Sequence, residues 1–142
     1  FSVMSIYPHF LAYFNELVGG SKNGYLYTVD SNLDWGQDLK RLKKWVDVND
    51  IDKIYIEYFG GGDARYYFKE KFAPWSGSLT ENEFPKNNYL AVSATFLQGG
   101  RGKPAPGFDQ RQGHYLWLNK YTPITKIGNS IFVYYIPDRK DY

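Results

Sequence analysis

The chain has 142 residues, of which 43% are apolar, and it carries 17 Lys and Arg against 15 Asp and Glu. This length fits one domain with a real core, and a net charge of +2 is too small to indicate a nucleic acid or an acidic membrane surface as a partner. The absence of cysteine excludes disulfides, thiolate catalysis and Cys-based zinc sites.

The region before residue 50 predicts a helix, a strand and a second helix. Apolar residues recur at helical spacing over residues 8–18. Residues 25–30 form a β-prone run that ends in residues suited to capping a helix. In the helix that follows, one face is apolar and much of the remaining surface is basic. The apolar positions are Trp35, Leu39, Leu42 and Val46.

The middle of the chain continues this alternation of strand and helix. Residues 54–59 predict an interior strand covered on both faces, with Glu57 the exception in an otherwise apolar run. After a glycine turn, Asp63 is suited to cap a short helix over residues 64–72. Residues 74–88 predict a long surface loop, which in a compact domain is usually functional or loosely ordered.

The last part of the chain predicts two strands, over residues 89–96 and 130–136. Between them, the glycine-rich residues 99–107 predict a mobile loop and residues 114–121 a short helix. Strands that alternate with helical segments indicate βαβ units. We therefore predict a single soluble α/β domain over residues 1–142, a three-layer sandwich with a mostly parallel sheet of about four main strands.

The densest polar cluster is the segment DSNLDWGQD, residues 30–38. It holds three carboxylates, two carboxamides, a hydroxyl and an indole where a strand end meets a helix start, the place where open α/β sheets bind ligands. A structural role is the alternative, with Ser31 or Asn32 capping the helix. Acid and base catalysis or calcium binding also stays open, because spacing alone does not decide it. The candidate binding residues are Asp30, Asn32, Asp34, Trp35, Gln37 and Asp38.

A second junction, GGGDAR at residues 60–65, also joins a strand to a helix and can present backbone N–H groups to an anion. Its glycines do not match the dinucleotide fingerprint and Asp63 would repel an anion, so a tight turn is the simpler interpretation. We keep Asp63 and Arg65 as candidate binding residues. No phosphate-loop, metalloprotease or hydrolase motif occurs, so we predict no catalytic residue, no metal and no cofactor.

Aromatic residues are unusually frequent, with 14 Tyr, 10 Phe and 4 Trp making up 20% of the chain. Tyrosine and tryptophan combine large apolar area with a polar group, which suits protein interfaces, sugar faces and the membrane boundary. Burial in the core is the alternative for any single ring.

Four phrases of the sequence together resemble a known family. They are YPHFLAYFNE (residues 7–16), VDSNLDWGQDL (29–39), SATFLQG (93–99) and IGNSIFVY (127–134). The resemblance is to the C-terminal soluble region of bacterial and archaeal membrane glycosyltransferases of the family 39, mannosyltransferase-like kind. It touches most of the chain and leaves residues 74–88 unmatched.

The resemblance implies a parent enzyme with many upstream membrane helices and a polyprenyl-phosphate-linked sugar as donor. This chain would then be a C-terminal fragment of that protein on the extracytoplasmic face of the membrane. Its partners would be the membrane-embedded part of the same polypeptide and a glycan or lipid-linked sugar. The catalytic acid of such enzymes lies in an early loop outside this chain. We therefore expect an accessory domain that positions acceptor or donor and does not turn over substrate alone.

Two other functions stay open at this point. The first is a small free-standing carbohydrate-active enzyme that uses Asp30, Asp34 or Asp38 as acid and base groups in a deep pocket. The second is a structural or protein-interaction domain, for which a broad exposed aromatic patch without a pocket would be typical.

Overall fold

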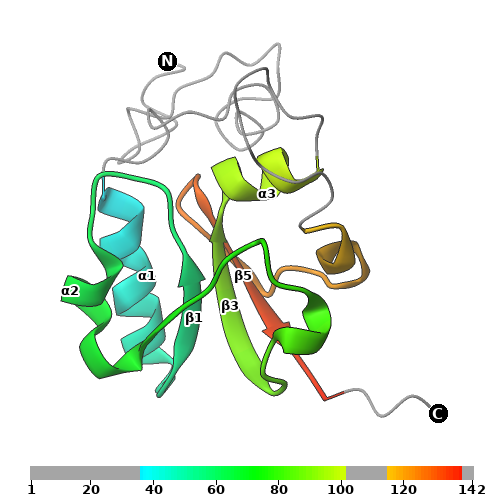
Figure 1. Cartoon of the computed structure of the whole chain (residues 1–142). Helices are drawn as coiled ribbons and strands as arrows, with labels where there is room; N and C mark the ends of the chain where they lie inside the picture. The colour runs from blue at the N-terminus through cyan, green and yellow to red at the C-terminus, as the bar shows by residue number, and fades with distance from the viewer. Residues whose placement is uncertain (1–35, 102–114, 139–142) are drawn as a thin grey trace.

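A computed structural model describes residues 36–101 and 115–138 of the chain (Figure 1). These residues form one sheet with helices around it. The α-helices are α1 (Gln37–Val48), α2 (Ala64–Phe68) and α3 (Ala94–Arg101). The short 3-10 helices are η6 (Lys69–Lys71), η7 (Glu81–Glu83) and η8 (Leu116–Lys120). The strands are β1 (Ile54–Glu57), β2 (Phe72–Pro74), β3 (Asn88–Ser93), β4 (Thr125–Ile127) and β5 (Ile131–Ile136).

The sheet has five strands in the order β2-β1-β3-β5-β4 and is mixed. The strand β1 pairs in parallel with β2 and with β3, whereas β5 runs antiparallel to both β3 and β4. The α/β class is therefore confirmed, but the mostly parallel sheet is not. The physical reason is that the short turn at residues 128–130 joins β4 directly to β5, and so short a connection is possible only between antiparallel strands.

The helix α1 confirms the apolar periodicity expected before residue 50. Its three inward positions Leu39, Leu42 and Val46 are completely buried. The predicted start of this helix was wrong, because α1 begins at Gln37 rather than after Ser31 or Asn32. Gly36 is its N-cap residue, with a φ of 105° that favours glycine and breaks the helical geometry at this point.

The core is divided into two clusters, one on each face of the sheet. On the first face, α1 and α2 lie side by side and pack against alternate residues of β1, β3 and β5 (Figure 1). That cluster includes Leu42, Phe68, Ile56, Ala91 and Val133. The second cluster packs on the opposite residues of the same strands. It includes Trp75, Phe84, Leu90, Leu97, Tyr115 and Tyr134.

Residues 74–88 form a long connection with many exposed residues, as the sequence predicts, but buried aromatic residues anchor it to the sheet. They pack across the second face of the sheet, where Trp75 is 8% exposed and Phe84 is 2% exposed. The ring centroids of these two residues lie 4.9 Å apart, and that of Phe84 lies 5.0 Å from that of Tyr55 on β1. Aromatic packing therefore holds this connection against the sheet although its composition is polar and rich in turn residues.

Several other boundaries differ from the predicted ones. The strand predicted over residues 89–96 ends at Ser93, and α3 follows directly through Arg101. The first residues of the predicted mobile loop are therefore helical, while residues 102–107 lie outside the described residues. The helix predicted at 8–18 and the strand predicted at 25–30 also lie outside them. The short helix expected at 114–121 is confirmed as η8.

Candidate functional site

Asp38, a candidate binding residue from the sequence, is 1% exposed and makes contacts within the fold. The backbone N–H groups of Asn129 and Ser130 donate to its Oδ2 at 2.9 and 3.1 Å, and the Ser130 hydroxyl donates to the same oxygen at 2.9 Å. The other oxygen, Oδ1, accepts from Nη1 of Arg41 at 2.5 Å. Asp38 therefore fastens the start of α1 to the turn between β4 and β5.

The turn is shaped to receive this carboxylate. A Cβ atom added at Gly128 would lie 2.0 Å from Oδ1 of Asp38, and the φ of Gly128 is +56°. Only glycine therefore fits there without displacing the carboxylate or straining the backbone. Because the partners are 91 and 92 residues apart in sequence, no local spacing could have revealed this link.

The same region joins three of the sequence phrases quoted above. Asp38 belongs to VDSNLDWGQDL and Ser130 belongs to IGNSIFVY. Ala94, from the phrase SATFLQG, donates its backbone N–H to the carbonyl oxygen of Ser130 at 2.6 Å. The side-chain hydroxyl of the neighbouring Ser93 accepts from the backbone N–H of Phe59 at 2.8 Å, and this bond connects the end of β1 to the end of β3. In the described residues, these phrases thus hold together one end of the sheet.

An opening lies beside this end of the sheet. The chain leaves β1 toward α2, which packs on the first face, and leaves β3 toward α3, whose Leu97 packs on the second face. Adjacent parallel strands whose connections diverge in this way leave a crevice at their carboxyl ends, which is where open α/β sheets bind ligands. A cleft of about 440 Å³ occupies this position, and sites for small ligands commonly measure about 300–1,000 Å³.

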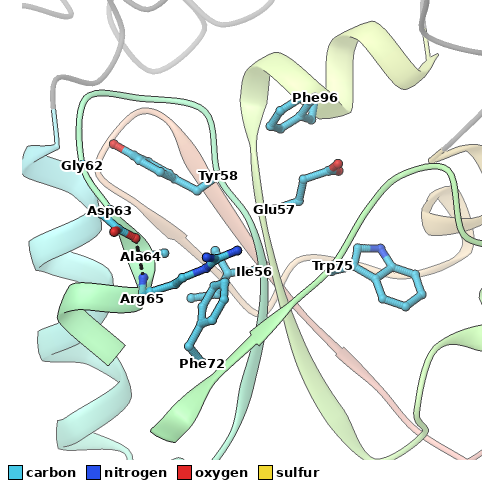
Figure 2. A pocket seen from close by; sticks show the side chains of 10 residues that line it. All are labelled: Ile56, Glu57, Tyr58, Gly62, Asp63, Ala64, Arg65, Phe72, Trp75 and Phe96. Carbon is cyan, nitrogen blue, oxygen red and sulfur yellow. Dashed lines mark hydrogen bonds between the residues drawn. The ribbon is translucent and has the colours of Figure 1, made fainter. Parts of the chain in front are cut away.

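The lining of the cleft combines aromatic rings with a few charged groups (Figure 2). The aromatic residues are Tyr58, Phe72, Trp75 and Phe96. The charged residues are Glu57, Asp63 and Arg65. Figure 2 shows the carboxylate of Glu57 pointing to the side that holds Trp75, while Arg65 reaches from α2 toward the end of β1. Flat apolar surfaces beside a small number of polar groups are the usual composition of a small-molecule site.

Glu57 is the most firmly held polar group of the cleft. Its Oε1 and Oε2 both accept from the backbone N–H of Gly77 at 3.0 Å, and Oε2 also accepts from the hydroxyl of Tyr115. The side chain is half-buried and lies on the second face of the sheet. Its orientation is thus fixed by donors from two distant segments before any ligand arrives.

Tyr115 is almost fully buried beside Glu57. Burial raises the pKa of its hydroxyl well above the ordinary value, and the negative charge of Glu57 and the hydrogen bond to it act in the same direction. The nearby Trp75 indole lowers that pKa by a smaller amount. Tyr115 therefore keeps its proton and remains a donor to Glu57. The buried Nε1–H of Trp75 itself has no hydrogen-bond partner of acceptable geometry within the described residues.

Asp63 and Arg65 were named from the sequence, and the structure brings both to the cleft. The Asp63 carboxylate accepts from the backbone N–H of Arg65 at 2.9 Å, so Asp63 is the predicted cap of α2. Both side chains are exposed at the rim. In the part of the chain that the structure describes, the Arg65 guanidinium takes part in no ion pair, which leaves it available to a ligand.

The other predicted site residues have different outcomes. Asp30, Asn32, Asp34 and Trp35 lie outside the described residues. Gln37 opens α1 and is half-buried, but neither it nor Asp38 lines the cleft. Three residues of the cleft were not among the candidates from the sequence, namely Glu57, Trp75 and Phe96. Of these, only Glu57 had a sequence feature that could have indicated a functional role, because it is a single carboxylate inside an otherwise apolar strand.

Residues 36–101 and 115–138 contain no group of three or more His, Asp or Glu arranged to hold a metal ion. In the same residues, no helix is both long and apolar enough to cross a membrane. No protein-family model matches the chain, and comparisons with curated proteins and with solved structures found no match either.

Proposed function

We propose that this chain is an extracytoplasmic accessory domain of a membrane glycosyltransferase that uses a polyprenyl-phosphate-linked sugar. In this proposal the domain binds the sugar part of an acceptor or donor in the cleft at the end of β1, and the bond-making residues lie in the membrane-embedded part of the same polypeptide. A three-layer arrangement of the complete domain belongs to this proposal as well.

The observation that carries the proposal is the composition and position of the cleft. Aromatic side chains offer flat apolar faces to the C–H groups of a sugar ring, while the fixed carboxylate of Glu57 offers an acceptor and the exposed guanidinium of Arg65 offers donors to its hydroxyls. The family resemblance supplies the context of a membrane glycosyltransferase. An interaction domain would present a broad aromatic patch without a pocket, and the cleft is the feature that favours ligand binding instead.

The alternative of a free-standing enzyme is less well supported. It requires Asp30, Asp34 or Asp38 as acid and base groups in a deep pocket, and Asp30 and Asp34 lie outside the described residues. Asp38 instead accepts hydrogen bonds from the turn between β4 and β5, and it does not line the cleft. Glu57 is held by the neutral donors Gly77 and Tyr115, and the second carboxylate of the cleft, Asp63, caps α2 by accepting from a backbone N–H.

Binding is tested by titrating the 142-residue chain with a mixed oligosaccharide fraction and with a short-chain polyprenyl-phosphate sugar, using calorimetry. We expect saturable binding that weakens in Arg65→Ala. The matched control is Lys44→Ala, which removes an exposed cation of α1 away from the cleft and should bind as the unaltered chain does. Failure of every sugar ligand to bind would refute the proposed role of the cleft.

The membrane context has a separate test in the coding sequence upstream of Phe1. The proposal expects a series of long apolar segments there, each able to span a bilayer in about 20 residues. An upstream region that encodes only polar or amphipathic segments would contradict the proposed parent enzyme.

A further inference from the structure

We propose that the cleft selects an uncharged sugar ring, whose hydroxyl groups donate to Glu57, and discriminates against sugars that carry a phosphate or carboxylate. This inference rests on the proposed function and specifies the ligand of the same site. It assigns the cleft to a neutral glycan rather than to the phosphorylated head group of a lipid-linked sugar.

The carboxylate of Glu57 has capacity to accept a further hydrogen bond. An ionised carboxylate offers about four lone-pair positions for hydrogen bonds. Within the described residues, Gly77 approaches both oxygens and Tyr115 approaches Oε2, so Oε1 is the less occupied oxygen. A sugar hydroxyl can donate to this oxygen, whereas a phosphate or carboxylate oxygen that carries no proton has nothing to donate.

The balance of charge around the cleft also favours a neutral ligand. Its lining residues include two carboxylates, Glu57 and Asp63, and one cation, Arg65. Glu57 is half-buried, where charges interact more strongly than in bulk water, and its position is fixed by its donors. Arg65 is exposed, so its attraction for an anion is weakened by solvent. Repulsion from Glu57 therefore outweighs attraction to Arg65 for an anionic group that binds next to the Glu57 carboxylate.

The apolar part of the lining favours an uncharged ring as well. Tyr58, Phe72 and Phe96 are half-buried and line the cleft (Figure 2). Tyr58 and Phe72 also pack against the core cluster on the first face of the sheet, and Phe96 packs against the cluster on the second face. Phe96 is held in place by an edge-to-face contact with Phe59, with their ring centroids 5.8 Å apart. Such rings favour the C–H face of a neutral pyranose, and the two phenylalanine rings offer no hydrogen bonds to replace the water lost by an anion.

The test compares neutral and anionic forms of the same sugars on the full 142-residue chain. The probes are the methyl glycosides of glucose, galactose and mannose and the 1-phosphates of the same three sugars, titrated at pH 7 and low ionic strength. The readout is the dissociation constant from NMR shifts of the Trp75 indole N–H and of backbone amides around the cleft. We expect at least one methyl glycoside to bind about tenfold or more tightly than its 1-phosphate.

Two variants assign the discrimination to Glu57. Glu57→Gln keeps an acceptor oxygen but removes the charge, so the preference for the neutral sugar should shrink at least about threefold. Glu70→Gln removes an exposed carboxylate of η6 that does not line the cleft, and the preference should be unchanged. An unfolded variant would be recognised by the loss of dispersed amide signals.

The possible outcomes separate this inference from the proposed function. If the 1-phosphates bind as tightly as the methyl glycosides or more tightly, the inference is wrong while the cleft remains a sugar site. If Glu57→Gln leaves the preference unchanged, Glu57 is not its cause and the inference is also wrong. If none of the probes shifts the cleft signals, the proposed function itself fails.

Discussion

The link between Asp38 and the β4–β5 turn gives the sharpest prediction about the fold. Replacing Asp38 by alanine removes the acceptor for three donors of residues 129 and 130 and the partner of Arg41. A buried donor left without an acceptor costs about 1–3 kcal/mol. Since water entering the space of the lost carboxylate recovers part of this cost, we expect the free energy of unfolding to fall by about 3–5 kcal/mol.

A second substitution in the same link supplies the test of its cause. Gly128→Ala should be destabilising for two reasons, a left-handed backbone that costs about 1 kcal/mol in alanine and a collision of the new Cβ with the Asp38 carboxylate. In an Asp38→Ala background the collision is absent and only the backbone cost remains. The double variant should therefore be more stable than the sum of the single effects predicts, by about 1 kcal/mol or more.

The assay is urea unfolding followed by tryptophan fluorescence and circular dichroism. Asp52→Ala, which removes an exposed carboxylate shortly after α1, serves as the control and should leave the free energy of unfolding almost unchanged. Should Asp38→Ala fall below the range in which unfolding can be measured, the whole series is repeated in trimethylamine N-oxide, which raises the stability of the folded state. The reasoning is refuted if the effects at Asp38 and Gly128 add within about 0.5 kcal/mol.

The stability of the fold should fall at high pH because of Tyr115. Above pH 10.0, the ordinary pKa of tyrosine, the unfolded chain releases the Tyr115 proton and the folded chain keeps it. The free energy of unfolding therefore falls by about 1.4 kcal/mol per pH unit through this group. Tyr115→Phe should abolish that contribution in alkaline urea titrations, and equal slopes in both proteins would exclude it. Phe84→Ala should cost about 3–5 kcal/mol in thermal or urea unfolding, since the ring is buried on the second face; a loss below about 1 kcal/mol would mean that residues 74–88 do not pack as described. Arg65→Ala should leave the melting temperature almost unchanged while weakening sugar binding, whereas a large drop in melting temperature would assign Arg65 to the fold.

The parts of the fold that the sequence predicted are those with a regular apolar pattern. The spacing of Leu39, Leu42 and Val46 indicated the buried face of α1 because a helix repeats every 3.6 residues. The apolar, β-branched runs that became β1 and β5 were also recognisable. The three-residue strands β2 and β4 are too short to show a period, and they form because neighbouring strands offer backbone hydrogen bonds.

The candidate site was less predictable because its residues come from separate segments. Asp63 and Arg65 were found at a strand–helix junction, where a local pattern exists. Trp75 and Phe96 lie in segments that were expected to be a surface loop and the end of a strand, so nothing local connected them with Glu57. For Asp38 the prediction of a ligand site was wrong in the opposite sense. Its place in a polar cluster indicated ligand binding, whereas its carboxylate accepts hydrogen bonds from a turn 91 residues away.

The central claim is that sugar binds in the cleft at the end of β1, and mapping the backbone amides that respond to a bound sugar tests it most directly. The account predicts that a saturating oligosaccharide shifts residues 57–65, 75–77 and 96 and leaves α1 and the β4–β5 turn unchanged. Shifts concentrated at residues 36–38 and 128–130, or no shifts at all, would contradict it.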